Sequence, residues 1–410
     1  MSAQTTDEGY PMNRRSFLMA ASMLALTHGL GLTGCGRPSQ GSVRVRLLNR
    51  SVPVQLLREF QRRNDPAENL NFLSSEQLAD LYDLLQRWQG AETTEEQRPT
   101  PIADLLTLGD VWLTPAIQQG LIQPLNLSQV DGWQPLANQE IWRTLVQRDQ
   151  QGQPSPEGEI WAAPYRWGTM MIAYQAELFA EQGWILPTDW GDLWRPEFAR
   201  RISLLDSPRS VIGLTLKKLG QSVNTADLAA VANLEPELAA LHQQVKVYSS
   251  DAYLQPLILQ DTALAVGWST EILPLVRRDR RIAAVVPASG TILTADLWVQ
   301  PASVPTLTSN DTTNEETNEE TVERSTLLQQ WLAFCWEPSI ATQLSVLSSG
   351  ISPIFFNSDR SQLPAALQES EQLLPSAKVL QQSEFLLPLP ESAIDQYRRL
   401  WEAVRLGKSR

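Results

Sequence analysis

Short apolar runs alternate along the chain with stretches in which apolar residues recur every three or four positions. Continuous runs of this length are typical of buried strands, and the recurring spacing is typical of amphipathic helices. We expect strands at 43–48 and 102–108, and helices at 54–63, 75–88 and 115–119. Pro53 and Gly120 support two of these helix ends, because proline favours a helix start and glycine a helix end.

The same pattern restarts after residue 200. We expect strands at 202–205, 263–267 and 282–286, and helices at 210–219 and 226–242. Strands that alternate with helices indicate parallel pairing with crossover helices, and two such blocks imply two lobes. Because ligands of such sheets bind beyond the carboxyl ends of the strands, the expected fold class is α/β with two βα lobes around a ligand cleft.

A polar and acidic stretch without periodicity, 304–324, interrupts the second block. Its composition predicts an exposed, disordered insertion. It holds six acidic residues, so nearly half of the net charge of −13 is unrelated to a ligand: Asp311, Glu315, Glu316, Glu319, Glu320 and Glu323. A calcium loop needs a central glycine, and this stretch has none. We expect no metal site in the chain.

The first 35 residues read as an export signal, with Arg14 and Arg15 before an apolar run at 17–32. The arginine pair followed by Ser-Phe-Leu is similar to a twin-arginine signal, and an ordinary Sec signal is the alternative. Leu-Thr-Gly-Cys at 32–35 resembles a bacterial lipobox, so Cys35 is expected to carry the lipid anchor; a chance cysteine is the alternative. The apolar run is too short and glycine-rich for a preferred spanning helix. Residues 36–42 are expected to form a spacer.

Composition excludes several classes of function. The 410 residues, 42% of them hydrophobic, suffice for two globular domains. A net charge of −13 without a basic cluster argues against a nucleic-acid partner. His242 is the sole histidine outside the signal, and neither a nucleophile elbow nor a phosphate loop occurs, so we expect no enzyme and no cofactor. Cys335, inside an apolar helical pattern, is predicted to be a buried core thiol.

The segment 162–225 is the most distinctive part of the chain. It contains APYRWGTMMIAY and PTDWGDLWRPEFARRISLLDSPRSVIGLTLKKLGQSVNT. These stretches resemble the spermidine/putrescine-binding proteins of bacterial ABC importers, and the resemblance covers most of 43–407. It implies a type II periplasmic-binding-protein fold whose cleft closes on the ligand like a hinged clamp.

Pattern and resemblance together predict how the chain is divided. The expected parts are an export signal at 1–35, a spacer at 36–42, the first part of lobe 1 at 43–171, the first part of lobe 2 at 172–296, a return to lobe 1 at 297–345 and the C-terminal part of lobe 2 at 346–410.

The resemblance implies two site residues directly. Trp268 stands where the family has a cleft tryptophan, and Asp296 where it has an acid that pairs an amine. A polyamine site needs such carboxylates and aromatic faces. Core filling by Trp268 and a hinge cap by Asp296 are the alternatives.

Other positions depart from the family pattern. Ser207 and Ser210 replace two acids, and Thr294 and Ile351 replace aromatic residues. The family's serine and tyrosine after the first strand correspond roughly to Gly109 and Val111. Neighbouring residues that could compensate are Asp110, Trp112, Asp206, Tyr165 and Trp167. Core packing is the alternative for Trp112 and Trp167.

The leading hypothesis is a monomeric receptor in the periplasmic space, anchored to the membrane by lipidated Cys35 alone. It would deliver a polyamine or a related small amine to an ABC permease and its ATPase. The alternative is a degenerate relative that keeps the fold but acts as an envelope sensor or protein-interaction module. A ferric site is not expected, because no Tyr-Tyr pair occurs.

Overall fold

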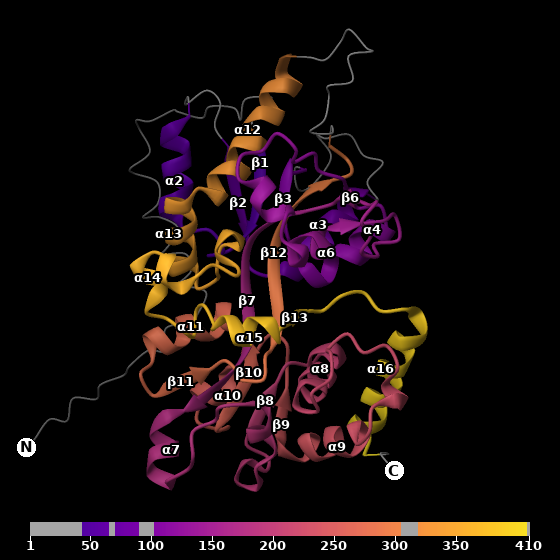
Figure 1. The fold of residues 1–410 in the computed structure, drawn as a ribbon, viewed down its shortest axis with the longest axis vertical. Helices are drawn as coiled ribbons and strands as arrows, with labels where there is room; N and C mark the ends of the chain where they lie inside the picture. The colour runs from indigo at the N-terminus through magenta and orange to yellow at the C-terminus, as the bar shows by residue number, and fades with distance from the viewer. Residues whose placement is uncertain (1–42, 65–69, 90–101, 305–318, 408–410) are drawn as a thin grey trace, which may run out of the picture. The chain divides into compact units, whose positions relative to one another are not determined.

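A computed structural model describes residues 43–64, 70–89, 102–304 and 319–407 (Figure 1). The expected export signal, with Arg14, Arg15 and Cys35, and the spacer at 36–42 lie outside the described residues. So does most of the acidic insertion. The described residues belong to one compact unit.

A central sheet runs through this unit, with the strand order β2-β1-β3-β12-β7-β10-β8-β9. Its strands are β1 (Arg44–Leu48), β2 (Asn71–Ser75), β3 (Leu105–Gly109), β7 (Ala163–Gln175), β8 (Ile202–Leu204), β9 (Val245–Tyr248), β10 (Leu264–Trp268) and β12 (Ile292–Pro301). Three short strands pair at its sides: β4 (Ile122–Gln123) and β13 (Glu384–Phe385) with β12, and β11 (Ile282–Val285) with β7. A separate hairpin joins β5 (Gln147–Arg148) to β6 (Glu159–Ile160).

The predicted parallel pairing is confirmed in both halves of the sheet. Strand β1 runs parallel to β2 and β3, and β8 runs parallel to β9 and β10. The antiparallel strands β7 and β12, which stand between these halves, were not predicted. The fold class is therefore α/β, with a mixed sheet.

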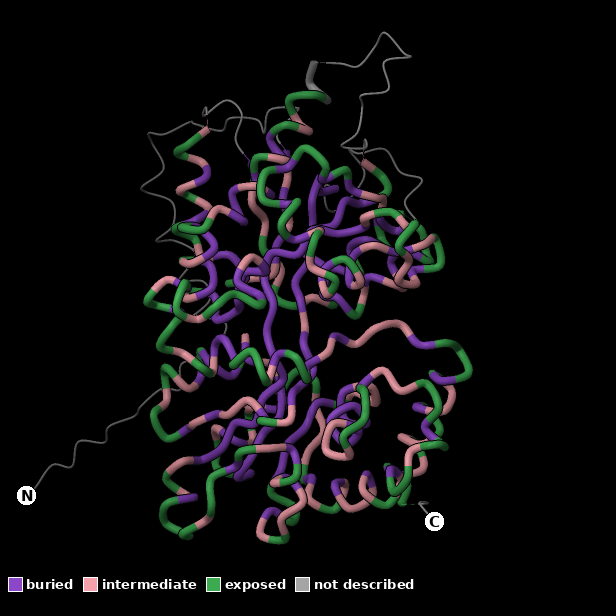
Figure 2. The backbone as a smooth tube through the Cα atoms, viewed as in Figure 1, coloured by how far each residue is buried: buried purple, intermediate pink, exposed green. Residues whose placement is uncertain are grey.

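Strand β7 links the two halves. All 13 of its residues are buried, as the continuous purple tube in Figure 2 shows. Its first half pairs with β12, and its second half, from Met170 to Tyr174, pairs with β10. One uninterrupted strand thus contributes to both halves of the sheet.

Helices cover the sheet. The longer ones are α2 (Val54–Arg63), α3 (Leu78–Gln89), α8 (Pro208–Lys218), α9 (Leu234–Gln244), α11 (Ser269–Arg278), α12 (Glu319–Trp336), α13 (Pro338–Ser348) and α16 (Glu391–Arg405). The shorter ones are α4 (Leu113–Gln118), α5 (Trp133–Ala137), α6 (Glu140–Val146), α7 (Ala176–Gln182), α10 (Gln255–Ile258), α14 (Ala365–Gln368) and α15 (Ala377–Gln381). None of the described helices has both the length and the apolar character needed to cross a membrane.

Two helix predictions need correction. The helix expected at 75–88 begins at Leu78, because Asn71–Ser75 pairs with β1 as a strand. The helix expected at 226–242 is interrupted, because Val231 is extended and Asn233 has a left-handed φ of 63°. Only the 3-10 turn Leu228–Ala230 and α9 are helical there.

The insertion predicted to be disordered, 304–324, was also predicted to extend too far. Its last six residues belong to α12, which begins at Glu319. Arg324 in this helix forms a 2.8 Å ion pair with the buried Asp104, which fixes the segment against the body. The prediction for Cys335, in the same helix, is confirmed, because its thiol is buried.

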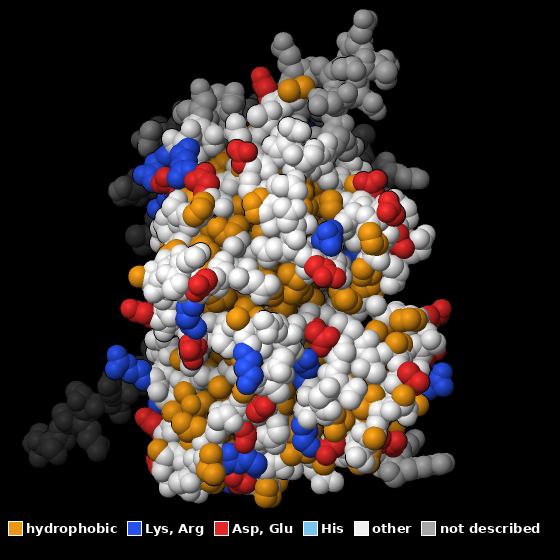
Figure 3. All heavy atoms as spheres, viewed as in Figure 1, with side chains coloured by type: hydrophobic (Ala, Val, Ile, Leu, Met, Phe, Trp, Pro, Cys, Tyr) orange, Lys and Arg blue, Asp and Glu red, His pale blue; other side chains and the backbone are white. Residues whose placement is uncertain are grey.

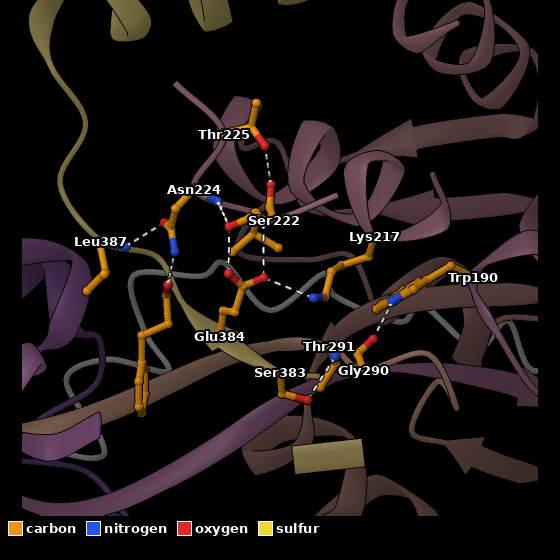
Figure 4. Close-up of polar contacts among 12 residues, drawn as sticks. Trp190, Lys217, Ser222, Asn224, Thr225, Gly290, Thr291, Ser383, Glu384 and Leu387 are labelled. Carbon is orange, nitrogen blue, oxygen red and sulfur yellow. Dashed lines mark hydrogen bonds and ion pairs between the residues drawn. The ribbon is translucent and has the colours of Figure 1, made fainter. Parts of the chain in front are cut away.

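The KKLGQSVNT motif at 217–225 holds the C-terminal segment in place (Figure 4). The carboxylate of Glu384 accepts hydrogen bonds from Lys217 Nζ at 2.9 Å, Ser222 Oγ at 2.5 Å and the Val223 amide at 3.2 Å. We call these contacts, together with those of Asn224, the C-terminal latch.

Asn224 forms the other half of the latch. Its Nδ2 donates to the Phe385 carbonyl at 2.9 Å, and its Oδ1 accepts from the Leu387 amide at 2.8 Å and from Arg209 Nη2 at 3.0 Å. The latched strand β13 pairs in turn with β12. The most recognisable motif of the sequence therefore has a structural role.

The Asn224→Ala variant is expected to lower the free energy of unfolding by about 1–3 kcal/mol, because three polar partners lose their hydrogen bonds. Urea unfolding followed by circular dichroism measures the change. Gln221→Ala, at an exposed position of the same loop, serves as the control and should change little. Equal stability of the two variants would show that the latch contributes nothing.

Candidate ligand-binding site

Charged residues of the neighbouring strands β12 and β7, and the residue that follows β3, lie next to one another across the sheet. Asp296 of β12 lies directly opposite Gly109 of β3 on one side and Arg166 of β7 on the other. Asp110 follows Gly109 and begins the 3-10 turn Asp110–Trp112. The predicted site residues Asp110 and Asp296 are thus brought together, with Arg166 as a third member that sequence reasoning missed.

Asp296 is neutralised within the protein. Arg166 donates from Nε to Asp296 Oδ2 at 2.6 Å, and its Nη2 also pairs with that oxygen. Both side chains are buried, at 6% and 10% exposure. Gly350 makes room for the arginine, because a Cβ there would lie 2.4 Å from Arg166 Cγ.

Asp110 retains an unused oxygen. Its Oδ1 accepts a 2.9 Å hydrogen bond from Thr294 Oγ1, whereas its buried Oδ2 has no hydrogen-bond partner in the described part of the chain. Burial raises the pKa of Asp110 to about 7, and the nearby Asp296 carboxylate adds to the rise. Hydrogen bonds from Thr294 and the Ala295 amide oppose it.

Glu271 is a third acid near this pair, and it too was missed. It lies in the first turn of α11, three residues after Trp268, and accepts a 2.6 Å hydrogen bond from Tyr253 Oη. Desolvation raises the pKa of its carboxyl although the side chain reaches solvent. Its charge interacts with those of Arg166 and Asp296.

Close packing at two glycines holds Glu271 in place. A Cβ at Gly267 would lie 2.0 Å from the Tyr253 ring, and one at Gly168 would lie 2.6 Å from Ser269 Oγ. The glycines therefore let Tyr253 and the start of α11 approach the sheet. The sequence offered one signal for Glu271, because this acid follows the Gly-Trp element by three residues.

Trp268 is half-buried at the end of β10, opposite Met170 of β7. Asp296 pairs with Arg166, which precedes Met170 by four residues on β7. Strand β12, which carries Asp296, and strand β10, which carries Trp268, lie on opposite sides of β7. Strand geometry places the two Cα atoms on the order of 15 Å apart. Trp268 and Asp296 therefore cannot contact the same ammonium, but they can lie at opposite ends of one ligand.

Two predicted aromatic residues lie inside the packed core. Tyr165 is fully buried, stacks on Trp298 and hydrogen-bonds Ser51 at 2.9 Å and Thr107 at 3.1 Å through its hydroxyl group. Trp167 is 1% exposed and packs edge-on against Phe356. A ligand would have to displace core side chains to reach either ring.

The remaining predicted residues lie around α3, α8 and α16. Half-buried Trp112 stacks on Tyr82 of α3 at 4.5 Å. Ser207 caps α8 by accepting from the Ser210 amide. Exposed Asp206 pairs with Arg405 of α16 at 2.8 Å.

Ser210, in the first turn of α8, is buried among apolar side chains. The side chains around it leave no room for a water molecule: Met170, Leu204, Leu205, Val211, Leu214 and Val266. No preformed cavity therefore lies at this position.

The described residues contain no group of His, Cys, Asp or Glu that could hold a metal ion. Figure 3 shows Lys and Arg interspersed with Asp and Glu on the visible face, and hydrophobic side chains gathered in a band between its upper and lower halves. The charge on that face is mixed rather than segregated, in keeping with the absence of a basic cluster from the sequence.

Comparison with known proteins identifies the family of the chain. Residues 100–374 match the family model described as bacterial extracellular solute-binding protein. The chain is 22% identical over 305 residues to spermidine/putrescine-binding periplasmic protein 1 of Haemophilus influenzae, which covers 74% of this chain and 75% of that protein. It is 24% identical over 200 residues to the spermidine/putrescine-binding periplasmic protein of Salmonella typhimurium, which covers 49% of this chain and about half, 54%, of that relative.

The fold is shared with a solved structure, the substrate-binding protein PotD of the spermidine/putrescine ABC transporter from Streptococcus pneumoniae. The TM-score is 0.70 at 19% identity, with 90% of this chain and 99% of that chain covered. The resemblance inferred from 162–225 and the expected type II periplasmic-binding-protein fold are confirmed. The chain belongs to the family of bacterial extracellular solute-binding proteins.

Proposed function

We propose that the chain is an extracytoplasmic receptor, anchored through lipidated Cys35, that binds a small aliphatic amine as a monomer and delivers it to an ABC permease and its ATPase. The relatives named for spermidine and putrescine support this ligand class. The observation that carries it is Asp110, a buried carboxylate with one unpartnered oxygen in the described structure, near Asp296.

The chemistry of an amine suits these residues. Burial of a carboxylate oxygen without a partner costs several kcal/mol, which an ammonium donor offsets. Glu271 adds a second negative charge, and Trp268 offers a partly exposed aromatic face for methylenes or a cation.

We also propose that two lobes form a clamp that closes on the ligand. We propose lobe 1 at 43–171 and 297–345 and lobe 2 at 172–296 and 346–410. Strands β7 and β12 run between the two halves of the sheet, and the charged residues lie on these strands and beside them. Relative motion of the halves would open and close the site.

Titration calorimetry of the full chain in detergent tests the proposal. At pH 8 the protein should bind at least one of putrescine, spermidine and n-butylamine, and Asp110→Asn should weaken that binding about tenfold or more, because the ammonium loses its carboxylate. Asp206→Asn, at an acid that pairs with Arg405, serves as the control. The proposal is wrong if no amine gives heat, or if Asp110→Asn binds like the wild type.

A further inference from the structure

The guanidinium of Arg166 lies beside Asp296, in the position where an ammonium group of the ligand would pair with this carboxylate. Its guanidinium pairs with Asp296 Oδ2 through two nitrogens, and the pair is withdrawn from solvent. A carboxylate that is paired in this way has no charge left to neutralise an incoming ammonium.

The arginine is held in this position from several sides. Its Nη1 lies 3.4 Å from the Ser348 carbonyl oxygen, and its methylenes occupy the space that Gly350 leaves open. Its backbone belongs to β7, where it pairs with Asp296 in register. The guanidinium is therefore a fixed part of the site rather than a mobile surface group.

The positive charge also acts on the neighbouring acid. Arg166 interacts with the Glu271 carboxyl, on the other side of Asp296 from Asp110. A second ammonium in this region would find Asp296 already paired with Arg166, and the Glu271 carboxyl already interacting with the same guanidinium. Asp110 is left as the buried acid that has an oxygen free to accept.

We infer that Arg166 is a specificity-determining residue: it occupies the ammonium position at Asp296, so the site prefers a monocationic amine to a diamine of the same length. The inference rests on the proposed function, because it concerns the charge of the amine. A solute with one ammonium and an uncharged far end fits Asp110 at one end and the apolar or aromatic surfaces at the other.

Two amines with the same four-carbon chain test the inference, n-butylamine and putrescine, because they differ only in the second amino group. Titration calorimetry at pH 8 should show that the wild type binds n-butylamine at least as tightly as putrescine. Arg166→Met frees Asp296 and should raise the affinity for putrescine about tenfold or more, with little change for n-butylamine.

The double variant Arg166→Met/Asp296→Asn is the matched control, because it removes the arginine together with the carboxylate that the arginine neutralises. It should lose the gain in putrescine affinity. A gain that persists in the double variant overturns the inference, as does an unchanged ratio of the two affinities in Arg166→Met.

Arg166→Met leaves a buried carboxylate unpaired, so its folding is checked by circular dichroism. If this variant does not fold, the wild-type ratio decides: a preference for putrescine overturns the inference, and equal affinity or a preference for n-butylamine supports it. Binding of neither amine by the wild type contradicts the proposed function itself, and the inference falls with it.

Discussion

The Asp296→Asn variant is expected to unfold with about 3–5 kcal/mol less free energy than the wild type. The substitution removes the negative charge that neutralises Arg166, and the guanidinium remains buried at 6% exposure. A buried charge without a counter-charge is among the most costly defects that one substitution can create. Urea unfolding at pH 7, followed by circular dichroism, measures the loss.

Asp395→Asn is the matched control for this experiment. Asp395 also pairs with an arginine, Arg398, but both side chains are largely exposed on α16. Water compensates for the lost partner there, so stability should change little. If Asp296→Asn is no more destabilised than Asp395→Asn, the Arg166–Asp296 pair is not the buried charge pair described above.

Asp110→Asn is expected to have the opposite effect and to stabilise the protein by up to about 4 kcal/mol at pH 8. The pKa of Asp110 is raised from 3.8 to about 7, so the folded state holds this proton more tightly than the unfolded state. Stability therefore falls as the pH rises from about 4 to 7, and the full cost is present above pH 7. An asparagine side chain has no such proton to lose.

Urea unfolding of Asp110→Asn and wild type at pH 4, 6 and 8 checks this prediction. The two proteins should be similar at pH 4 and diverge as the pH rises, because the unfavourable ionisation of Asp110 occurs only in the wild type. Parallel stability curves over this range would contradict a buried acid with a raised pKa at this position.

The same substitution is expected to stabilise the fold and to weaken amine binding. Such a combination is typical of a residue kept for function, because its unfavourable burial is offset only when the ligand is present. Asp296 should behave differently, because its charge is already offset by Arg166. The two neighbouring acids of the site thus have opposite roles in stability.

The segment at 162–225 that resembles the family contains residues with two different roles. The motif at 217–225 fixes β13 through Glu384 and Asn224 in the C-terminal latch. Arg166, earlier in the same segment, belongs to the candidate site, whereas Asp110 lies outside the segment.

Local signals in the sequence were sufficient for many individual elements. Helix α2 begins at Val54, directly after Pro53, as the apolar spacing and the proline predicted. Strands β8 and β10 lie within about one residue of their predicted positions. Asn233 was one exception, because the apolar spacing of the surrounding residues does not reveal a single residue with a left-handed backbone.

Local pattern and motif by themselves determined the α/β class and the family, and they predicted two acids of the candidate site, Asp110 and Asp296. Only the tertiary structure decided that Asp296 is already paired, because Arg166 lies 130 residues earlier and meets it through the register of β7 and β12. Strand pairing between distant segments depends on the whole sheet, whereas apolar periodicity reports only which face of each segment is buried. The net charge that a ligand encounters is therefore a property of the folded sheet.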